Sequence, residues 1–196
     1  MSVTTIPQCL PDDETQCEWI LGDESTKDKV TNAPGYPARI PKPRIPDLHE
    51  VRSTPDMGQG LFARHDIKCG ELVFAERPLL VSPQSLLVIP TGILPHYSFL
   101  EFRQIQAFLF ERMLEYVFAR MPSDSQADYR ALHNAHTRDG TGPLFGIKRT
   151  NGYSISNLFD GPEDRRGTKY SALCKIASRL NHRCVFLYIF LFLSFS

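Results

Sequence analysis

The feature that most constrains the fold is a long helical pattern set between segments of strand-like sequence. In the stretch SFLEFRQIQAFLFERMLEYVFARM, apolar residues recur at the spacing of one helix face: Phe99, Phe102, Ile105, Phe108 or Leu109, and Met113. This spacing predicts a helix over about 98–120 that Pro122 ends. We expect its aromatic stripe to pack in the core, because an apolar stripe on a helix usually faces the protein interior.

Segments on both sides of this helix have the composition of short strands. Before it, LHEVRST, GLFARHDI and ELVFAERPLLV are β-type pieces punctuated by Gly58, Gly60 and Gly70, which predicts a small β-meander. After it, SDSQADYRALHNAHT predicts a second, shorter helix and GPLFGIKRTNGYSISN is again strand-like. A polar loop, NLFDGPEDRRGTKYS, then precedes a short helix-like turn in ALCKIASRLN. Together these segments predict an α+β fold.

The first 48 residues have the composition of a tail. PDDETQCEWILGDESTKDK is acidic and polar, and APGYPARIPKPRIP has a proline every two to four residues. Proline removes backbone donors and blocks helix formation, and little apolar material is present to offset the ordering entropy. We therefore expect residues 1–48 to be a disordered, acidic and proline-rich tail. Docking of Trp19 and Ile20 on the body or on a partner stays open as an alternative.

Charge and cysteine content narrow the function classes. The formal net charge of the chain is zero, and the body after residue 50 holds 17 basic and 13 acidic residues. This excess is too small to indicate direct nucleic-acid binding. The 5 cysteines are scattered, form no CxxC motif and follow an N-terminus without the basic-then-apolar layout of a signal peptide. We expect an intracellular protein, in the nucleus or the cytoplasm.

A glycine-rich bend, MGQGLFA, is the first candidate binding element. Two glycines let backbone amides approach a ligand, but the third glycine and the following helix of a dinucleotide fingerprint are missing. The motif by itself therefore favours a plain β-turn over a binding element.

The wider sequence around this bend resembles the SET domain family of protein-lysine methyltransferases. GQGLFARHDIKCGELVFAERPLL is similar to the family's opening G-x-G-[LV]-F/R-A element, D-I-x-x-G-E turn and strand into E-x-P. RTNGYSI and SRLNH follow in the family's order, the latter resembling its N-H-S-C-x-P-N element. The insertion length and the TN-aromatic element look most like the SET and MYND and fungal SET branch, although Gly152 separates Asn151 from Tyr153 and no MYND-type cluster of cysteines and histidines is present.

This resemblance, over about residues 50–184, implies a β-rich SET core with a helical insertion at about 96–140, incomplete at its C-terminus. It implies transfer of a methyl group from S-adenosylmethionine to a lysine of a histone or other protein. Such an in-line displacement depends on alignment and on a neutral lysine amine. The residues that match the family's cofactor-binding motifs are Gly58, Gln59, Gly60 and Leu61 for the methionine part, Asn151 for its polar end, and Asn181 and His182 for the amino-carboxylate and adenine.

The residue types suit these roles. Asparagine offers both a donor and an acceptor, and a bend of free amides suits a carboxylate. Without the resemblance, a helix C-cap and a surface histidine is the favoured interpretation of Asn181 and His182; with it, the cofactor role is favoured.

Metal binding is not expected. Cys174, His182 and Cys184 lack a fourth ligand and paired spacing, and His133 and His136 on the second helix lack a carboxylate at ligand spacing. These two histidines are expected to face solvent.

The C-terminal sequence departs from the family after Asn181 and His182. The chain continues NHRCVFLYIFLFLSFS, in which no active-site tyrosine can be assigned; Tyr188 lies too close to the Asn-His pair. We therefore assign no catalytic residue and expect a truncated, inactive chain. Residues 185–196 are expected to lie outside the fold, and we hypothesise that residues 184–196 are translated intron sequence.

Two alternatives to the inactive methyltransferase stay open. The first is a binding or regulatory protein on a SET scaffold. The second is a membrane protein anchored by its tail, which the tail's length disfavours because a bilayer core needs about 20 apolar residues.

Overall fold

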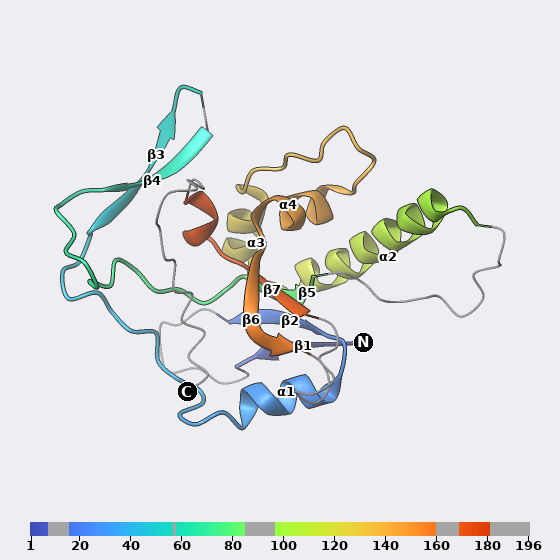
Figure 1. Ribbon diagram of the computed structural model, residues 1–196, viewed down its shortest axis with the longest axis horizontal. Helices are drawn as coiled ribbons and strands as arrows, with labels where there is room; N and C mark the ends of the chain where they lie inside the picture. The colour runs from blue at the N-terminus through green and yellow to red at the C-terminus, as the bar shows by residue number, and fades with distance from the viewer. Residues whose placement is uncertain (8–15, 57, 85–96, 160–168, 181–196) are drawn as a thin grey trace.

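The computed structural model describes residues 1–7, 16–56, 58–84, 97–159 and 169–180, and its fold is mixed α+β as expected. A five-stranded sheet has the order β1-β2-β5-β7-β6 (Figure 1). Its strands are β1 (Ser2–Ile6), β2 (Cys17–Leu21), β5 (Leu80–Pro83), β7 (Lys169–Leu173) and β6 (Tyr153–Phe159). Neighbouring strands are antiparallel except β2 and β5, which run parallel. The sheet thus joins segments from both ends of the described chain.

A separate hairpin pairs β3 (His49–Thr54) with β4 (Gly58–Ala63), away from the main sheet (Figure 1). A short 3-10 helix, η2 (Ala177–Arg179), follows β7, and β4 contacts it. Gly58 begins β4 with φ of +69°, a left-handed conformation that glycine adopts without the steric cost of a side chain.

Four α-helices complete the fold of the described residues, and local side chains cap two of them. They are α1 (Glu24–Thr31), α2 (Phe99–Arg120), α3 (Ser123–Arg130) and α4 (Pro143–Asn151). Asp23 caps α1, and Ser98 with Glu101 forms a capping box at the start of α2. The predicted long helix and the shorter one after Pro122 are therefore confirmed.

The two faces of the sheet are covered by different elements. Ile20, Leu80 and Leu173 face a cluster formed with α2, α3 and α4. Their strand neighbours, among them Trp19 and Val81, belong to a second cluster that includes Val30 of α1. Successive side chains of a strand point to opposite faces, so each short strand contributes to both clusters.

The N-terminal segment differs from the expected disordered tail. β1 and β2 form one side of the main sheet, α1 packs against β2, and Trp19 and Ile20 are buried. The alternative in which these two residues dock on the body describes the structure. Local composition could not predict the burial of this segment, because β2 becomes buried only when it pairs in parallel with β5, far along the chain.

Two further predictions are corrected by the described structure. The expected three-strand meander is a two-strand hairpin, since the third piece reaches strand geometry only at Leu80 and pairs in the other sheet. The strand-like GPLFGIKRTN is helix α4 up to Asn151, with Pro143 at its first turn. Proline is favoured at that position because the first helical N–H needs no intrahelical acceptor.

The aromatic stripe of α2 lies in the core only over part of its length. Phe99 is 77% exposed and Phe108 is 64% exposed, whereas Phe110, Leu114 and Val117 are buried. The expectation of a core-facing stripe is therefore wrong for the N-terminal half. That half extends beyond the sheet in Figure 1. Its apolar face therefore has no core to pack against among the described residues.

A buried carboxylate fixes the start of α4. Glu111, on α2, accepts hydrogen bonds from the Leu144 N–H at 3.0 Å and the Phe145 N–H at 2.7 Å. Gly142, just before α4, has no side chain to cap the helix, and a Cβ there would lie 2.3 Å from Glu111 Cδ. Glu111 thus supplies the cap from another helix, and glycine provides the room for it.

We expect Glu111→Gln to lower the free energy of unfolding by about 2 kcal/mol, because hydrogen bonds to a charged acceptor are stronger and one N–H loses its acceptor. Urea unfolding measures the change. Glu115→Gln, at an exposed carboxylate on the same helix, is the matched control and should change stability by no more than about 0.5 kcal/mol. Equal effects of the two substitutions would contradict the capping role.

Lys148 places a second buried charge on α4. The residue is 5% exposed, its Nζ donates to the carbonyl oxygens of Pro83 at 2.9 Å and Gln84 at 3.3 Å, and it lies 5.0 Å from the Phe110 ring centroid. Burial lowers the pKa of Lys148 to about 8. The Lys148 ammonium group therefore links α4 to the end of β5. Removing this charge from water costs free energy of desolvation.

This pKa predicts a pH-dependent stability difference between the native chain and Lys148→Met. Between about pH 8 and the unfolded pKa near 10.5, the unfolded chain binds more protons at Lys148 than the folded chain, so the contribution of Lys148 to stability rises with pH. The unfolding free energy of the native chain minus that of Lys148→Met should increase by about 2 kcal/mol between about pH 7 and pH 10. Urea unfolding at several pH values measures it, and a constant difference would refute it.

Candidate functional site

The described structure places five of the seven predicted cofactor residues. Gly58, Gln59, Gly60 and Leu61 lie on β4, and Asn151 is the last residue of α4. Asn181 and His182 lie outside the described residues. The prediction that strand, and not helix, follows the glycine-rich bend is confirmed.

The bend residues form the first part of β4. Gly58 pairs with Thr54 in register, and the Thr54 hydroxyl donates to the Gly58 carbonyl at 2.9 Å. Gly60 is buried opposite Arg52, whereas Gly58 and Gln59 are exposed. β3 pairs with one edge of β4, so alternate backbone groups of β4 point to its other edge. The N–H groups among them are donors of the kind that a carboxylate ligand would use.

Asn151 is brought near β4 through η2. β4 contacts η2, and the Ser178 hydroxyl of η2 donates to the Asn151 carbonyl at 3.3 Å. The same hydroxyl accepts a 3.4 Å hydrogen bond from the Cys174 N–H at the end of β7. Three sequence motifs that lie far apart in the chain therefore converge: the glycine-rich bend, the TNG element and the segment leading to Asn181.

The Asn151 side chain is mostly engaged within the protein. Its amide nitrogen donates to the carbonyl oxygens of His133 at 2.7 Å and Ile147 at 2.7 Å, and the residue is buried. These bonds fasten the loop after α3 to α4. They do not use the amide oxygen, which is an acceptor and suits an ammonium group better than a carboxylate.

Glu76 is the residue that positions η2. Its carboxylate accepts from the Ile176 N–H, at 2.9 Å to each oxygen, and from the Ala177 N–H at 2.6 Å. Desolvation raises the pKa of Glu76 against the opposing effect of these hydrogen bonds. The Tyr153 hydroxyl donates to the Ala177 carbonyl at 2.6 Å, and burial raises the pKa of this phenol. Helix η2 is thus held at both its N–H and its carbonyl groups.

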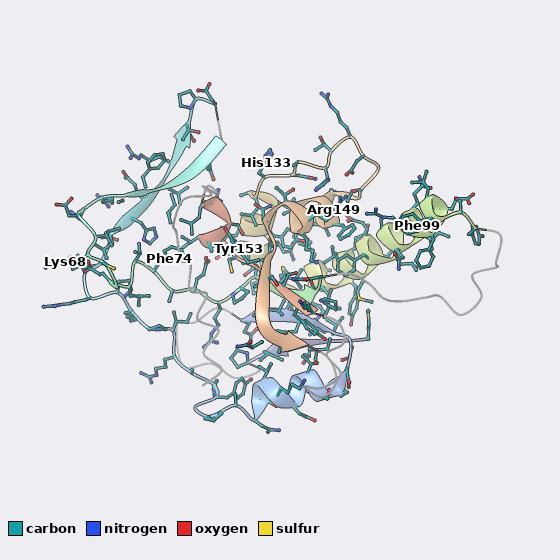
Figure 2. The ribbon with its side chains drawn as sticks, viewed as in Figure 1. Lys68, Phe74, Phe99, His133, Arg149 and Tyr153 are labelled. Carbon is teal, nitrogen blue, oxygen red and sulfur yellow. The ribbon has the colours of Figure 1, made fainter. Side chains whose placement is uncertain are left out.

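Aromatic side chains line the same region. Phe74, Tyr153 and Leu180 are partly buried against the second core cluster, and the His49 ring of β3 lies 5.2 Å from the Phe74 ring. Figure 2 shows Phe74 and Tyr153 in the region between the hairpin and β6. Glu76 and Tyr153 lie within the sequence motifs, but no local signal points to a role for them. Their positioning function becomes visible only when η2 is in place.

The structure contains no group of His, Cys, Asp and Glu residues suited to hold a metal ion within the described ranges. Cys174 is buried, and desolvation raises the pKa of its thiol well above the usual range. His182 and Cys184, which were considered with Cys174 as metal ligands, lie outside the described residues.

His133 and His136, which were expected on the second helix, lie after the end of α3 and do not belong to it. His133 is exposed as expected, but His136 is half-buried and its Nδ1 lies 2.7 Å from the Asp139 carboxylate. This carboxylate belongs to Asp139, which follows His136 by three residues in the loop.

Comparison of the chain with protein-family models, curated proteins and solved structures finds no match. Across the described part of the chain, no helix is both long enough and apolar enough to cross a bilayer. The apolar tail, which was the basis for the membrane alternative, lies outside the described residues.

We expect Glu76→Ala to release η2. Removing the carboxylate leaves the Ile176 and Ala177 N–H groups without their acceptor, so their amide protons should exchange with solvent at least about tenfold faster. Hydrogen-exchange mass spectrometry of a peptide spanning residues 174–180 measures this.

Glu71→Ala is the matched control, since Glu71 also accepts a backbone hydrogen bond, from Lys68, but in an exposed turn. Unchanged exchange over residues 174–180 in Glu76→Ala would show that other contacts position η2.

Proposed function

We propose that this chain carries the cofactor side of a SET-type protein-lysine methyltransferase and that its ligand is S-adenosylmethionine. The convergence of β4, η2 and Asn151 supports the proposal most strongly, because the resemblance links these segments to one cofactor. The outward edge of β4 offers backbone N–H donors to the amino acid carboxylate. The Asn151 amide oxygen offers an acceptor to the ammonium group.

Asn181 and His182 complete the proposed site. They follow η2 directly, and Glu76 and Tyr153 position that helix. In this proposal, Asn181 and His182 contact the amino-carboxylate and the adenine. The partner is a protein with a target lysine, a histone or another protein, in the nucleus or the cytoplasm.

We further propose that this chain binds the cofactor without transferring its methyl group. Methyl transfer by in-line displacement needs the lysine amine aligned and neutral. The resemblance assigns that alignment to an active-site tyrosine, for which the sequence offers no matching position. The chain then acts as a SET-type scaffold in binding or regulation, which is the first alternative left by the sequence.

Calorimetric titration with S-adenosylmethionine tests the cofactor site. The native chain should give a saturable heat of binding, and Gly58→Ala should weaken the affinity at least about tenfold. A side chain at φ of +69° strains the bend and alters the groups that approach the ligand.

Gly70→Ala is the matched control for this titration. Gly70 also has a positive φ, +81°, and open space where a Cβ would stand, so both substitutions should cost about 1–2 kcal/mol in stability. Gly70→Ala should leave the affinity unchanged. No heat with the native chain would overturn the proposal, and equal losses in the two variants would remove the bend from the site.

A second assay addresses catalysis. Incubation of the chain with methyl-labelled S-adenosylmethionine and mixed histones should give no labelled protein above a reaction without the chain. Labelling would show that the chain itself transfers methyl groups, and the non-catalytic part of the proposal would then be wrong.

A further inference from the structure

A cavity of about 320 Å³ lies on the face of the sheet that carries α1, apart from the glycine-rich bend. Strands β1 and β2, the end of α1, the loop after it and residues 75–78 surround it. This volume lies at the lower end of the range for small-molecule pockets. The space suits a ligand with one or two rings.

The cavity has an apolar floor and an exposed rim. Trp19, Cys17 and Val30 are buried residues of its wall, and Tyr36 adds a second aromatic ring. Arg39 is an exposed residue of the same wall. A ligand therefore meets apolar and aromatic surface inside and a cationic group at the solvent side. Large aromatic rings bury much apolar area and stack with other rings.

The charges around the cavity favour an anion. Among the described residues that line it, two guanidinium groups, of Arg39 and Arg77, stand against one carboxylate, that of Glu76. The Glu76 carboxylate accepts hydrogen bonds from the η2 amides, and the Arg77 guanidinium donates to the Ala38 carbonyl at 2.7 Å. The Cys17 thiol adds no negative charge, because burial raises its pKa well above the usual range. Arg39 is thus the exposed cation among the described residues of the cavity wall.

We propose that this cavity binds a small aromatic carboxylate, with the rings against Trp19 and Tyr36 and the carboxylate at Arg39. The proposal does not depend on the proposed cofactor site, because the two regions use different ligand-binding groups. They share Glu76, which lines the cavity and holds η2.

The ligand class is tested with three probes of one shape and different charge: 2-naphthoate, 2-naphthamide and 2-naphthylmethylammonium. Trp19 is the single tryptophan of the chain and lines the cavity, so its fluorescence reports binding directly. The full chain without S-adenosylmethionine should show a saturable change with naphthoate, at least about threefold weaker binding of the amide and the weakest binding of the ammonium probe.

Two pairs of variants locate the binding. Ala33→Phe, which fills the cavity from the loop after α1, should abolish naphthoate binding, whereas Ala119→Phe at an exposed position of α2 should leave it unchanged. Arg39→Gln should weaken naphthoate about twofold to fivefold and leave the amide unchanged, as expected for an exposed ion pair. Arg44→Gln, at an exposed arginine of the same loop outside the cavity, should change neither.

Circular dichroism of Ala33→Phe separates a filled cavity from an unfolded chain. If that variant does not fold, the Arg39→Gln and Arg44→Gln pair decides the proposal alone. Absence of a naphthoate signal, equal binding of the three probes, or equal effects of Arg39→Gln and Arg44→Gln would each overturn it.

Discussion

The Glu76 carboxylate is the interaction that the candidate cofactor site and the cavity have in common. It accepts backbone hydrogen bonds from Ile176 and Ala177 and thereby joins the segment before β5 to η2 after β7. The same side chain lines the cavity beside Trp19. A half-buried carboxylate is stable there because several N–H donors replace its water, although desolvation still raises its pKa. Loss of this one group would alter the candidate cofactor site and the cavity together.

Backbone groups, more than opposite charges, stabilise the buried charges on the helical side as well. Glu111 accepts from two N–H groups at the start of α4, and Lys148 donates to two carbonyls at the end of β5. Each contact joins elements that are distant in sequence. A buried charge without such partners is strongly unfavourable, so these bonds also select the packing of α4 against α2 and the sheet. The position of Asn151, at the end of α4, follows from that packing.

Local sequence predicted the elements whose signals are local. The α2 boundaries follow from Ser98, Glu101 and the proline at 122, all of which act within one helical turn. The aromatic stripe of α2 could not be resolved in the same way. Periodicity gives the face of a helix but not how much of that face meets the core, and in the described structure Phe99 and Phe108 stay exposed. The helix α4 was not predicted because its composition is mixed.

The sequence by itself determined the α+β class, the long helix, the strand after the glycine-rich bend and the order of the motifs. Tertiary structure alone decided that the N-terminal segment joins the sheet, because β2 needs β1 and β5 to bury Trp19 and Ile20. It also decided that η2 contacts both β4 and Asn151, and that Glu76 holds η2. Local patterns record preferences over a few residues, whereas pairing between distant strands and burial of a carboxylate depend on groups brought together only by folding.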